Sequence, residues 1–231
     1  MSDSPLSSFL KTVPIFRGLT SEQLTLVVQW MRERSVRAGT EIIAQGEPGD
    51  AVFVLAEGSA KVCRRQREGG EVILEVLGPG DVVGDMSLSD GIDHSSSVVA
   101  LEDARVLRLD AESFRGMLNE WSSARSGLIE LLCRRLRLAD GRLEMVAALD
   151  VEGRVARVLL MLAREHGEGK PGGGTRILIP LSQSDLAAMT GASRVRVNQV
   201  LSKFKRNGWV TLDGDRRTSV RDAAALEARC R

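Results

Sequence analysis

The segment LSQSDLAAMTGASRVRVNQVL, residues 181–201, has the pattern of two short helices joined by a tight turn. Ser182 and Ser193 are each placed to cap a helix, because a serine hydroxyl accepts a hydrogen bond from a free backbone N–H of the first turn. Asp185 stands three residues after Ser182 and can complete a capping box, and Gly191 suits the turn. The segment therefore predicts a helix-turn-helix.

The second of these helices is expected to bury Val197, Val200 and Leu201 and to expose a polar side. The exposed residue types suit DNA, because Arg pairs with guanine, Asn or Gln with adenine, and Lys with the phosphate backbone. The expected outward side chains are Arg194, Arg196, Asn198, Gln199 and Lys203. Together with the two caps, Ser182 and Ser193, they form the predicted DNA-binding set of the helices.

A β-hairpin is predicted after the second helix. Trp209–Leu212 and Arg216–Val220 are short strand-like runs, and the turn Asp213-Gly214-Asp215 joins them. A hairpin in this position is the wing of a winged helix. Arg216 and Arg217, near its tip, are expected to hold phosphate.

The charge of the chain is uneven. The 231 residues carry a net charge of +1, but residues 151–231 hold 15 Lys and Arg against 8 Asp and Glu, which gives +7 there and −6 for residues 1–150. A basic module joined to an acidic one is typical of a protein in which one half meets nucleic acid. Double-stranded DNA is therefore the expected partner.

Composition excludes several other classes. Hydrophobic residues make up 43% of the chain, and no apolar run approaches the roughly 18 residues that span a bilayer. The polar, acidic start is unlike a signal peptide. We therefore expect a soluble cytoplasmic protein without a membrane partner. Three widely spaced cysteines and two histidines offer no pattern for a metal, haem or iron–sulfur site, so none of these is expected.

The N-terminal part predicts helices followed by a β-roll. Residues 6–31 have the apolar spacing of helices, with a cap at Thr20 or Ser21. Residues 34–109 alternate short apolar runs such as Val52–Leu55 with Gly and Pro turn signals, which is typical of a β-sandwich or roll. The predicted fold is α+β: an N-terminal jelly-roll-like β-roll, a long helix and a C-terminal winged helix-turn-helix.

A short and a long helix are predicted over residues 111–149. On the long helix, apolar residues step alternately by four and three, which is the seam of a coiled coil. The seam consists of Leu132, Leu136, Ala139, Leu143 and Val146, continued by Asp150, with Ile129, Cys133 and Leu138 on other sides. We predict that it forms a parallel homodimer; the alternative is a plain core helix. The predicted domains are residues 1–110, the effector-binding roll, residues 111–149, the helices, and residues 150–231, the winged helix-turn-helix.

The chain resembles the CRP/FNR family of bacterial transcription regulators. The resemblance rests on Gly39–Ile43, Gln45–Asp50, Phe53–Gly58 and Leu77–Gly84 in the roll and on Ala148–Val151 after the long helix. It implies a homodimer in which an effector bound in the roll reorients two recognition helices to match half-sites about one helical turn apart. It also implies that residues 165–175 lie where relatives contact RNA polymerase.

The pocket implied by this resemblance differs from that of the family's cyclic AMP binders. They use a Gly-Glu pair for the ribose and an Arg-Ser pair for the cyclic phosphate, where this chain has Gly84-Asp85 and His94-Ser95. The change weakens the phosphate contact, because the planar guanidinium of Arg binds phosphate with two hydrogen bonds. Asp140 on the long helix replaces a serine of those relatives. The predicted effector residues are Gly84, Asp85, His94, Ser95, Ser96 and Asp140.

Three interpretations of the pocket stay open. It binds another ligand, such as a different nucleotide or a cyclic dinucleotide held by serines 95–97; it has lost ligand binding and leaves a constitutive DNA binder; or it binds cyclic AMP weakly through His94. Two further classes are disfavoured. A metal enzyme with a roll of this kind needs several histidines, and a regulatory module that does not contact DNA has no use for a basic helix-turn-helix.

The recognition helix also departs from many relatives. They have Ser-Arg-Glu where this chain has Ser193-Arg194-Val195. A carboxylate that accepts from cytosine is thus replaced by an apolar group suited to a thymine methyl. The preferred half-site is therefore expected to differ.

Overall fold

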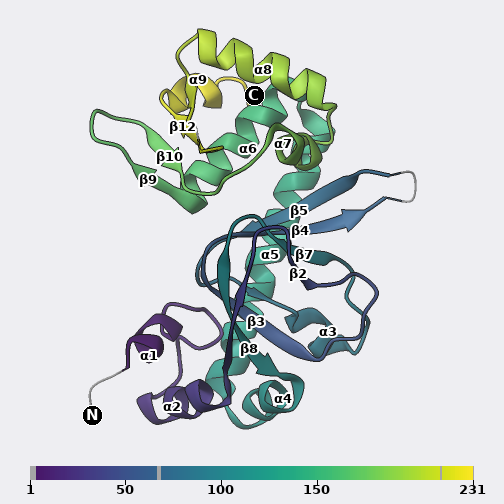
Figure 1. Cartoon of the computed structure of the whole chain (residues 1–231), viewed down its shortest axis with the longest axis vertical. Coiled ribbons are helices and arrows are strands. Elements are labelled where there is room, and N and C mark those ends of the chain that lie inside the picture. Colours follow the sequence, from purple (N-terminus) through teal and green to yellow (C-terminus); the bar gives the residue numbers. More distant parts are fainter. Residues whose placement is uncertain (1–3, 67–68, 214, 231) are drawn as a thin grey trace. The chain divides into compact units, whose positions relative to one another are not determined.

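The computed structural model describes residues 4–66, 69–213 and 215–230 (Figure 1). The chain divides into two compact units, residues 1–64 with 76–138 and residues 65–75 with 139–231. The first unit is a β-roll with helices, and the second contains the helix-turn-helix and a small sheet. The α+β fold class predicted from the sequence is confirmed.

Two short helices open the first unit: α1 (Pro5–Leu10) and α2 (Ser21–Trp30). The predicted cap of α2 is Thr20, whose hydroxyl accepts from the Gln23 N–H while the Gln23 side chain accepts from the Thr20 N–H. Residues 11–18 form turns instead of continuing the helical pattern. Pro14 lies among them and has no N–H to donate to a helix.

The roll consists of two four-stranded sheets, ordered β1-β8-β3-β6 and β2-β7-β4-β5. Their strands are β1 (Arg32–Val36), β2 (Glu41–Ile43), β3 (Ala51–Glu57), β4 (Ala60–Arg65), β5 (Glu71–Leu77), β6 (Val82–Val83), β7 (Ser97–Ala100) and β8 (Ala104–Asp110). The antiparallel pair β3–β8 joins Ala51 to Asp110 at one end and Glu57 to Arg105 at the other.

Strand β3 shows why its sequence is apolar without alternation. Val52 and Val54 belong to a core that also contains buried residues of the helices, including Phe114. Phe53 and Leu55 belong to a second core built from strands of both sheets. Both faces of the strand are therefore buried, so both alternating sets of side chains are apolar.

Three further helices accompany the strands of the roll. They are α3 (Asp85–Asp90), α4 (Ala111–Glu120) and α5 (Ser122–Ala148). Asp110 caps α4 by accepting from the Ser113 N–H at 2.9 Å, and this hydrogen bond lowers the pKa of the carboxyl. Helix α5 ends at Ala148, so Asp150 does not extend the predicted seam. Its carboxylate instead caps α6 by accepting from the Gly153 N–H at 2.8 Å.

The second unit has the elements α6 (Val151–His166), β9 (Gly167–Gly169), β10 (Thr175–Ile177), α7 (Gln183–Thr190), α8 (Arg194–Arg206), β11 (Val210–Leu212), β12 (Thr218–Val220) and α9 (Ala223–Glu227). Its sheet is ordered β11-β12-β10-β9. The predicted wing is the antiparallel pair β11–β12, with Val210 opposite Val220. Gly214, in the predicted turn of the wing, lies outside the described residues.

The helix-turn-helix forms as its sequence predicts. Ser182 accepts from the Asp185 N–H at 3.1 Å, the Asp185 carboxylate accepts from the Ser182 N–H at 2.9 Å, and Ser193 accepts from the Arg196 N–H at 3.3 Å. Gly191 ends α7 in the left-handed region, with φ +61°. The caps and the glycine therefore fix the start of α8 relative to α7.

We predict that Gly191→Ala lowers the free energy of unfolding by about 1 kcal/mol, because a Cβ is disfavoured in the left-handed region. Gly191→Asn is the matched control and should cost less, since Asn enters that region more readily. Urea unfolding followed by circular dichroism measures both. Equal stability of the glycine and alanine proteins would show that the turn does not depend on this residue.

Candidate nucleic-acid interface

Helix α8 has one buried side and one exposed side. Val197, Val200, Leu201 and Phe204 are buried, which includes the three residues predicted to be so. Phe204 is completely buried and packs on the Trp209 ring with centroids 5.3 Å apart. The exposed side chains are Arg194, Val195, Arg196, Asn198, Gln199, Ser202, Lys205 and Arg206.

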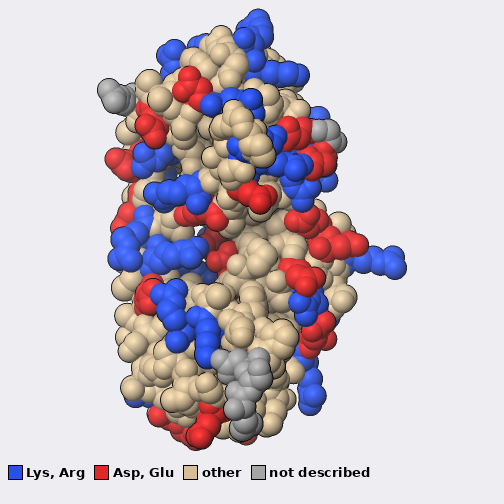
Figure 2. Space-filling model, turned by 90° about the vertical axis from the view of Figure 1, so that its left-hand side faces the viewer, with Lys and Arg blue, Asp and Glu red and all other residues tan. Residues whose placement is uncertain are grey.

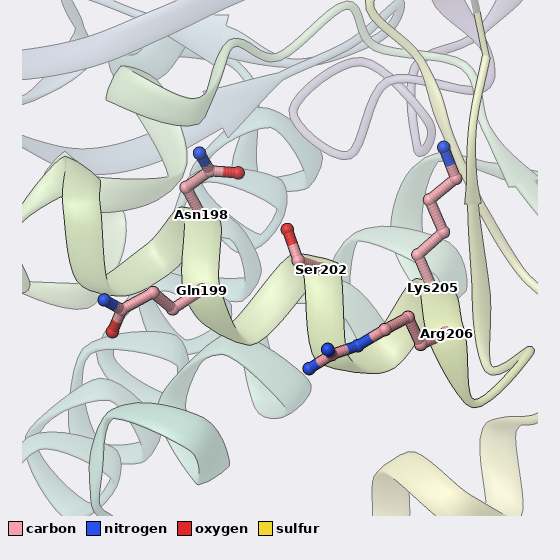
Figure 3. A pocket seen from close by; sticks show the side chains of 5 residues that line it. All are labelled: Asn198, Gln199, Ser202, Lys205 and Arg206. Atoms are coloured by element: carbon pink, nitrogen blue, oxygen red, sulfur yellow. The ribbon is translucent and has the colours of Figure 1, made fainter.

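The exposed side of α8 lines a shallow hollow of about 420 Å³. Figure 3 shows its five lining side chains, which project from successive turns of the helix. They are Asn198, Gln199, Ser202, Lys205 and Arg206. Ser202, Lys205 and Arg206 were not predicted. Ser202 follows Gln199 by three residues and Asn198 by four, and Lys205 and Arg206 follow Ser202 by three and four, which places all five on the same helix face.

The side chain of Lys203, predicted to be available on the outward side, is 42% exposed, but its ammonium group is paired within the unit. Its Nζ is 2.7 Å from Oε2 and 2.9 Å from Oε1 of Glu152 on α6. Glu152 also pairs with Nε of Arg229 at 3.4 Å, and the Arg229 guanidinium lies over the Trp209 ring. Lys203 follows buried Val200 by three residues, which turns it towards α6. The positive charge of Lys203 is therefore paired with a carboxylate within the second unit.

Two amides on α8 have defined partners. The Gln183 Nε2 donates to Asn198 Oδ1 at 3.2 Å, and the Arg196 Nη1 donates to Gln199 Oε1 at 3.3 Å. In both hydrogen bonds the amide oxygen accepts. The NH₂ groups of Asn198 and Gln199 are the parts of these side chains that can donate to another partner. The exposed face of α8 is therefore rich in donors.

Arg217 of the predicted wing pair is engaged within the unit. Its Nη1 donates to Asp215 at 3.0 Å, and its Nε donates to the Leu178 carbonyl. Desolvation by itself would raise the pKa of Asp215, but the hydrogen bond from Arg217 and the charge of Arg176 hold it below its usual value. Asp215 is thus an ionised partner for both arginines.

Arg216 is the more accessible arginine of the wing. Its side chain is 58% exposed, and its Nη2 lies 3.9 Å from Oδ2 of Asp185, the capping residue of α7. Its backbone adopts φ +64°, which is uncommon for a residue with a side chain. This conformation places a cation beside the N-terminus of α7.

Charge along α8 is of one sign. The 13 residues of the helix include five Lys and Arg and no Asp or Glu. Elsewhere the charges are mixed: Figure 2 shows Lys and Arg interspersed with Asp and Glu over the face in view. Helix α8 therefore contributes only positively charged groups to the surface of the second unit.

In the roll, Asp85 is bound by a cation that the sequence analysis did not identify. The Asp85 side chain is 1% exposed, and each of its carboxylate oxygens lies 2.9 Å from Nη1 of Arg135 on α5. Arg135 also donates to the Val82 carbonyl. Gly84 precedes Asp85 with φ +89°, and a Cβ there would lie 2.5 Å from the Ala51 carbonyl oxygen. The start of α3 thus requires glycine.

The other predicted effector residues lie in different surroundings. His94 is half-buried, with Nδ1 2.9 Å from the Ser87 Oγ. Ser95 is exposed and Ser96 half-buried, whereas Ser97 is buried and accepts from the Gln45 N–H at 3.0 Å. The second unit contains Asp140, which is exposed on α5.

A stripe of apolar residues runs along helix α5. Four predicted seam residues are exposed: Leu132 by 37%, Leu136 by 64%, Leu143 by 72% and Val146 by 55%, and Ala139 between them is exposed too. Ile129 was predicted on another side, but it is 61% exposed and precedes Leu132 by three residues, which extends the stripe. Exposed apolar residues at this helical spacing are typical of an interaction site.

Among the described residues, no three His, Cys, Asp or Glu side chains approach one another as a metal site requires. No helix in the described part of the chain is long and apolar enough to cross a membrane.

Comparison with known proteins identifies the family. Residues 33–120 match the cyclic nucleotide-binding domain, and residues 153–229 match the Crp-like helix-turn-helix domain. Over 94% of its length the chain is 35% identical to the cyclic AMP receptor protein of Thermus thermophilus, covering 97% of that protein. The chain belongs to the CRP/FNR family of transcription regulators.

Other CRP/FNR relatives agree with this assignment. The chain is 30% identical to the CRP-like cAMP-activated global transcriptional regulator of Mycobacterium tuberculosis over 98% of this chain and 100% of that one. The structure of FixK2 from Bradyrhizobium japonicum has a TM-score of 0.77 at 23% identity, covering 86% of this chain and 96% of that one, and supports the fold. The CRP/FNR relatives are transcription regulators, so this protein is a regulator and not an enzyme.

Asp85→Ala is predicted to lower the free energy of unfolding by about 1.5–3 kcal/mol, because Arg135 loses a charge-assisted interaction with the buried carboxylate. The double variant Asp85→Ala/Arg135→Met should lose less than the sum of the two single losses, since each single loss includes the same interaction. Urea unfolding of the four proteins measures the coupling. Strictly additive losses would contradict a coupled pair.

Proposed function

We propose that the protein is a homodimeric, sequence-specific DNA-binding regulator whose affinity for DNA is controlled by a nucleotide bound in its β-roll. Residues 1–110 form the effector domain, residues 111–149 dimerise, and residues 150–231 bind DNA. The observation that carries the proposal is the exposed side of α8, which holds cations and amides and no acid. The proposed place of action is the cytoplasm, where the DNA of bacterial relatives lies.

The DNA contacts divide into two groups. The first turns of α8 enter the major groove, where Arg194, Arg196, Asn198 and Gln199 reach base edges. Phosphates are held by exposed cations and by the two capped helix starts, because backbone N–H groups at a helix N-terminus favour an anion. The proposed phosphate-binding residues are Ser182, Ser193, Lys205, Arg206 and Arg216.

Dimerisation is proposed through the apolar stripe of α5. Its residues recur at the spacing that interlocks two parallel helices, and they are exposed in the single chain. A twofold dimer presents two copies of α8 to two half-sites about one helical turn apart. The segment of residues 165–175 is the proposed contact for RNA polymerase, on the family resemblance alone.

The proposed effector is a nucleotide held differently from cyclic AMP in its best binders. The Asp85–Arg135 pair offers an acceptor for a ribose hydroxyl next to a buried cation. The residues proposed to bind the phosphate are His94, Ser95 and Ser96. None of them has a guanidinium group, which binds phosphate with two parallel hydrogen bonds. The domain match and the cAMP-activated relative in Mycobacterium tuberculosis support a nucleotide. Cyclic AMP itself is therefore expected to bind weakly.

Three variants separate base reading from phosphate binding. Arg194→Ala should cost specific binding about 1–3 kcal/mol and affect random DNA less. Arg206→Ala should weaken binding to all sequences and reduce the salt slope by about 1, because one phosphate contact is lost. Lys203→Met is the control: it should leave the salt slope unchanged and lower stability, since Lys203 pairs with Glu152. Titration of selected and random duplexes over a range of salt gives all three results.

A thermal unfolding series tests the effector. At about 100 times its dissociation constant, a ligand stabilises the folded state by about 2.7 kcal/mol, which raises the midpoint by several degrees. We expect such a rise for the native protein with one of cyclic AMP, cyclic GMP and cyclic di-GMP. His94→Arg should bind cyclic AMP about tenfold or more tightly, because it restores a charge-assisted contact. No rise with any nucleotide, together with unchanged DNA affinity, would indicate a constitutive DNA binder.

A further inference from the structure

Val195 is an apolar side chain in the middle of the proposed DNA-reading surface. It is the second residue of α8, and it is 69% exposed. Asn198 and Gln199 follow it by three and four residues, so all three lie on one face of the helix. The inference drawn from this placement rests on the proposed DNA-binding function.

Folding of the chain does not account for a valine at this position. The residue is not part of the buried side of α8, and a β-branched side chain has a lower helix propensity than alanine. Isolated exposed apolar residues are common on protein surfaces. The position of Val195 is what distinguishes it, because residues in the first turns of a recognition helix reach base edges.

The C5-methyl group of thymine is the group of the major groove that best suits a valine. Adenine, guanine and cytosine present polar edges there, whereas thymine presents its C5-methyl group beside the O4 acceptor. A valine placed over a polar edge would displace water without replacing its hydrogen bonds, which is unfavourable. Against thymine, the same side chain buries a methyl group.

The neighbouring amide is suited to the other half of the thymine edge. Asn198 Oδ1 accepts from Gln183, which leaves the Asn198 NH₂ group to donate. Thymine O4 is an acceptor adjacent to the methyl group. We propose that Val195 selects thymine in each half-site by packing on its C5-methyl group, with Asn198 donating to O4.

The test begins with the full-length protein and a random duplex library, from which the preferred operator is selected. The operator is then resynthesised with uracil in place of each thymine in turn, in both half-sites. Uracil keeps O4 and lacks only the methyl group. At one position we expect the affinity of the native protein to fall about fourfold per substituted half-site, which corresponds to one buried methyl group.

Two protein variants complete the test. Val195→Ala should bind the thymine and uracil operators with equal affinity at that position, since its shorter side chain no longer reaches the methyl group. Leu26→Ala is the matched control: Leu26 is 42% exposed on α2, and its truncation should leave the uracil penalty intact. Both residues are exposed, so both variants should keep the native thermal midpoint.

A third operator tests the contribution of the methyl group independently of O4. 5-Methylcytosine, paired with guanine, keeps the methyl group and replaces O4 with an amino group. The native protein should bind it more tightly than unmodified cytosine at that position, and Val195→Ala should bind both equally.

The outcomes distinguish this inference from the proposed function. If no DNA is bound in a sequence-specific manner, the proposed function fails. If an operator is selected but uracil is tolerated at every position, DNA reading stands and the role of Val195 is wrong. A uracil penalty that persists in Val195→Ala would also overturn the inference, because another group would then read the methyl.

Discussion

Burial of one side of α8 determines what the other side can do. Phe204 is completely buried and packs on the Trp209 ring, and Val197, Val200 and Leu201 continue the buried side. Rotation of the helix by even one residue would expose these side chains and bury arginines, at a cost of several kcal/mol for each unpaired charge. The packing therefore fixes which residues face outward, and every DNA contact proposed for the helix follows from it.

Acidic residues of the second unit decide which cations remain available. Glu152 engages Lys203 and Arg229, and Asp215 engages Arg176 and Arg217. These cations hold α6, α8 and the wing strands together. Nothing acidic lies within α8 itself. The second unit thus contains cations whose carboxylate partners hold its elements together, and the exposed Lys205 and Arg206 of α8, which are proposed to meet phosphate.

In the roll, an ion pair connects α3 and α5. Asp85 is one of the proposed effector residues, and its carboxylate is held by Arg135 from α5. A ligand that binds Asp85 must share or displace that guanidinium. Because Arg135 is on the helix that carries the apolar stripe, this ion pair connects the proposed effector residues with the helix of the proposed dimer contact. Exchange of such a contact is the kind of difference between two states that allows a ligand to shift their populations.

Local signals in the sequence were sufficient for much of the architecture. The caps Thr20, Ser182 and Ser193 and the turn at Gly191 are short-range features, so a single segment predicts them. Lys203 and Arg135 were different, because their partners lie 51 and 50 residues away along the chain. No local pattern reveals such pairing.

Helix ends and faces account for the remaining differences. Asp150 continued the four-and-three spacing of the seam, but its carboxylate caps α6, since a cap competes with helix continuation. Ile129 and Ser202 were missed although the helical period places them on the exposed faces of α5 and α8. For these residues the sequence carried the information, and a full helical projection would have recovered it.

A hydroxyl-radical footprint of the full-length protein on its selected operator would show whether a twofold dimer reads two half-sites. We expect two protected half-sites related by twofold symmetry, with centres about 10 base pairs apart on one face of the duplex. We also expect that Arg194→Ala removes protection from both at the concentration that protects with the native protein. Protection of a single half-site, or uniform protection without sequence preference, would contradict this expectation.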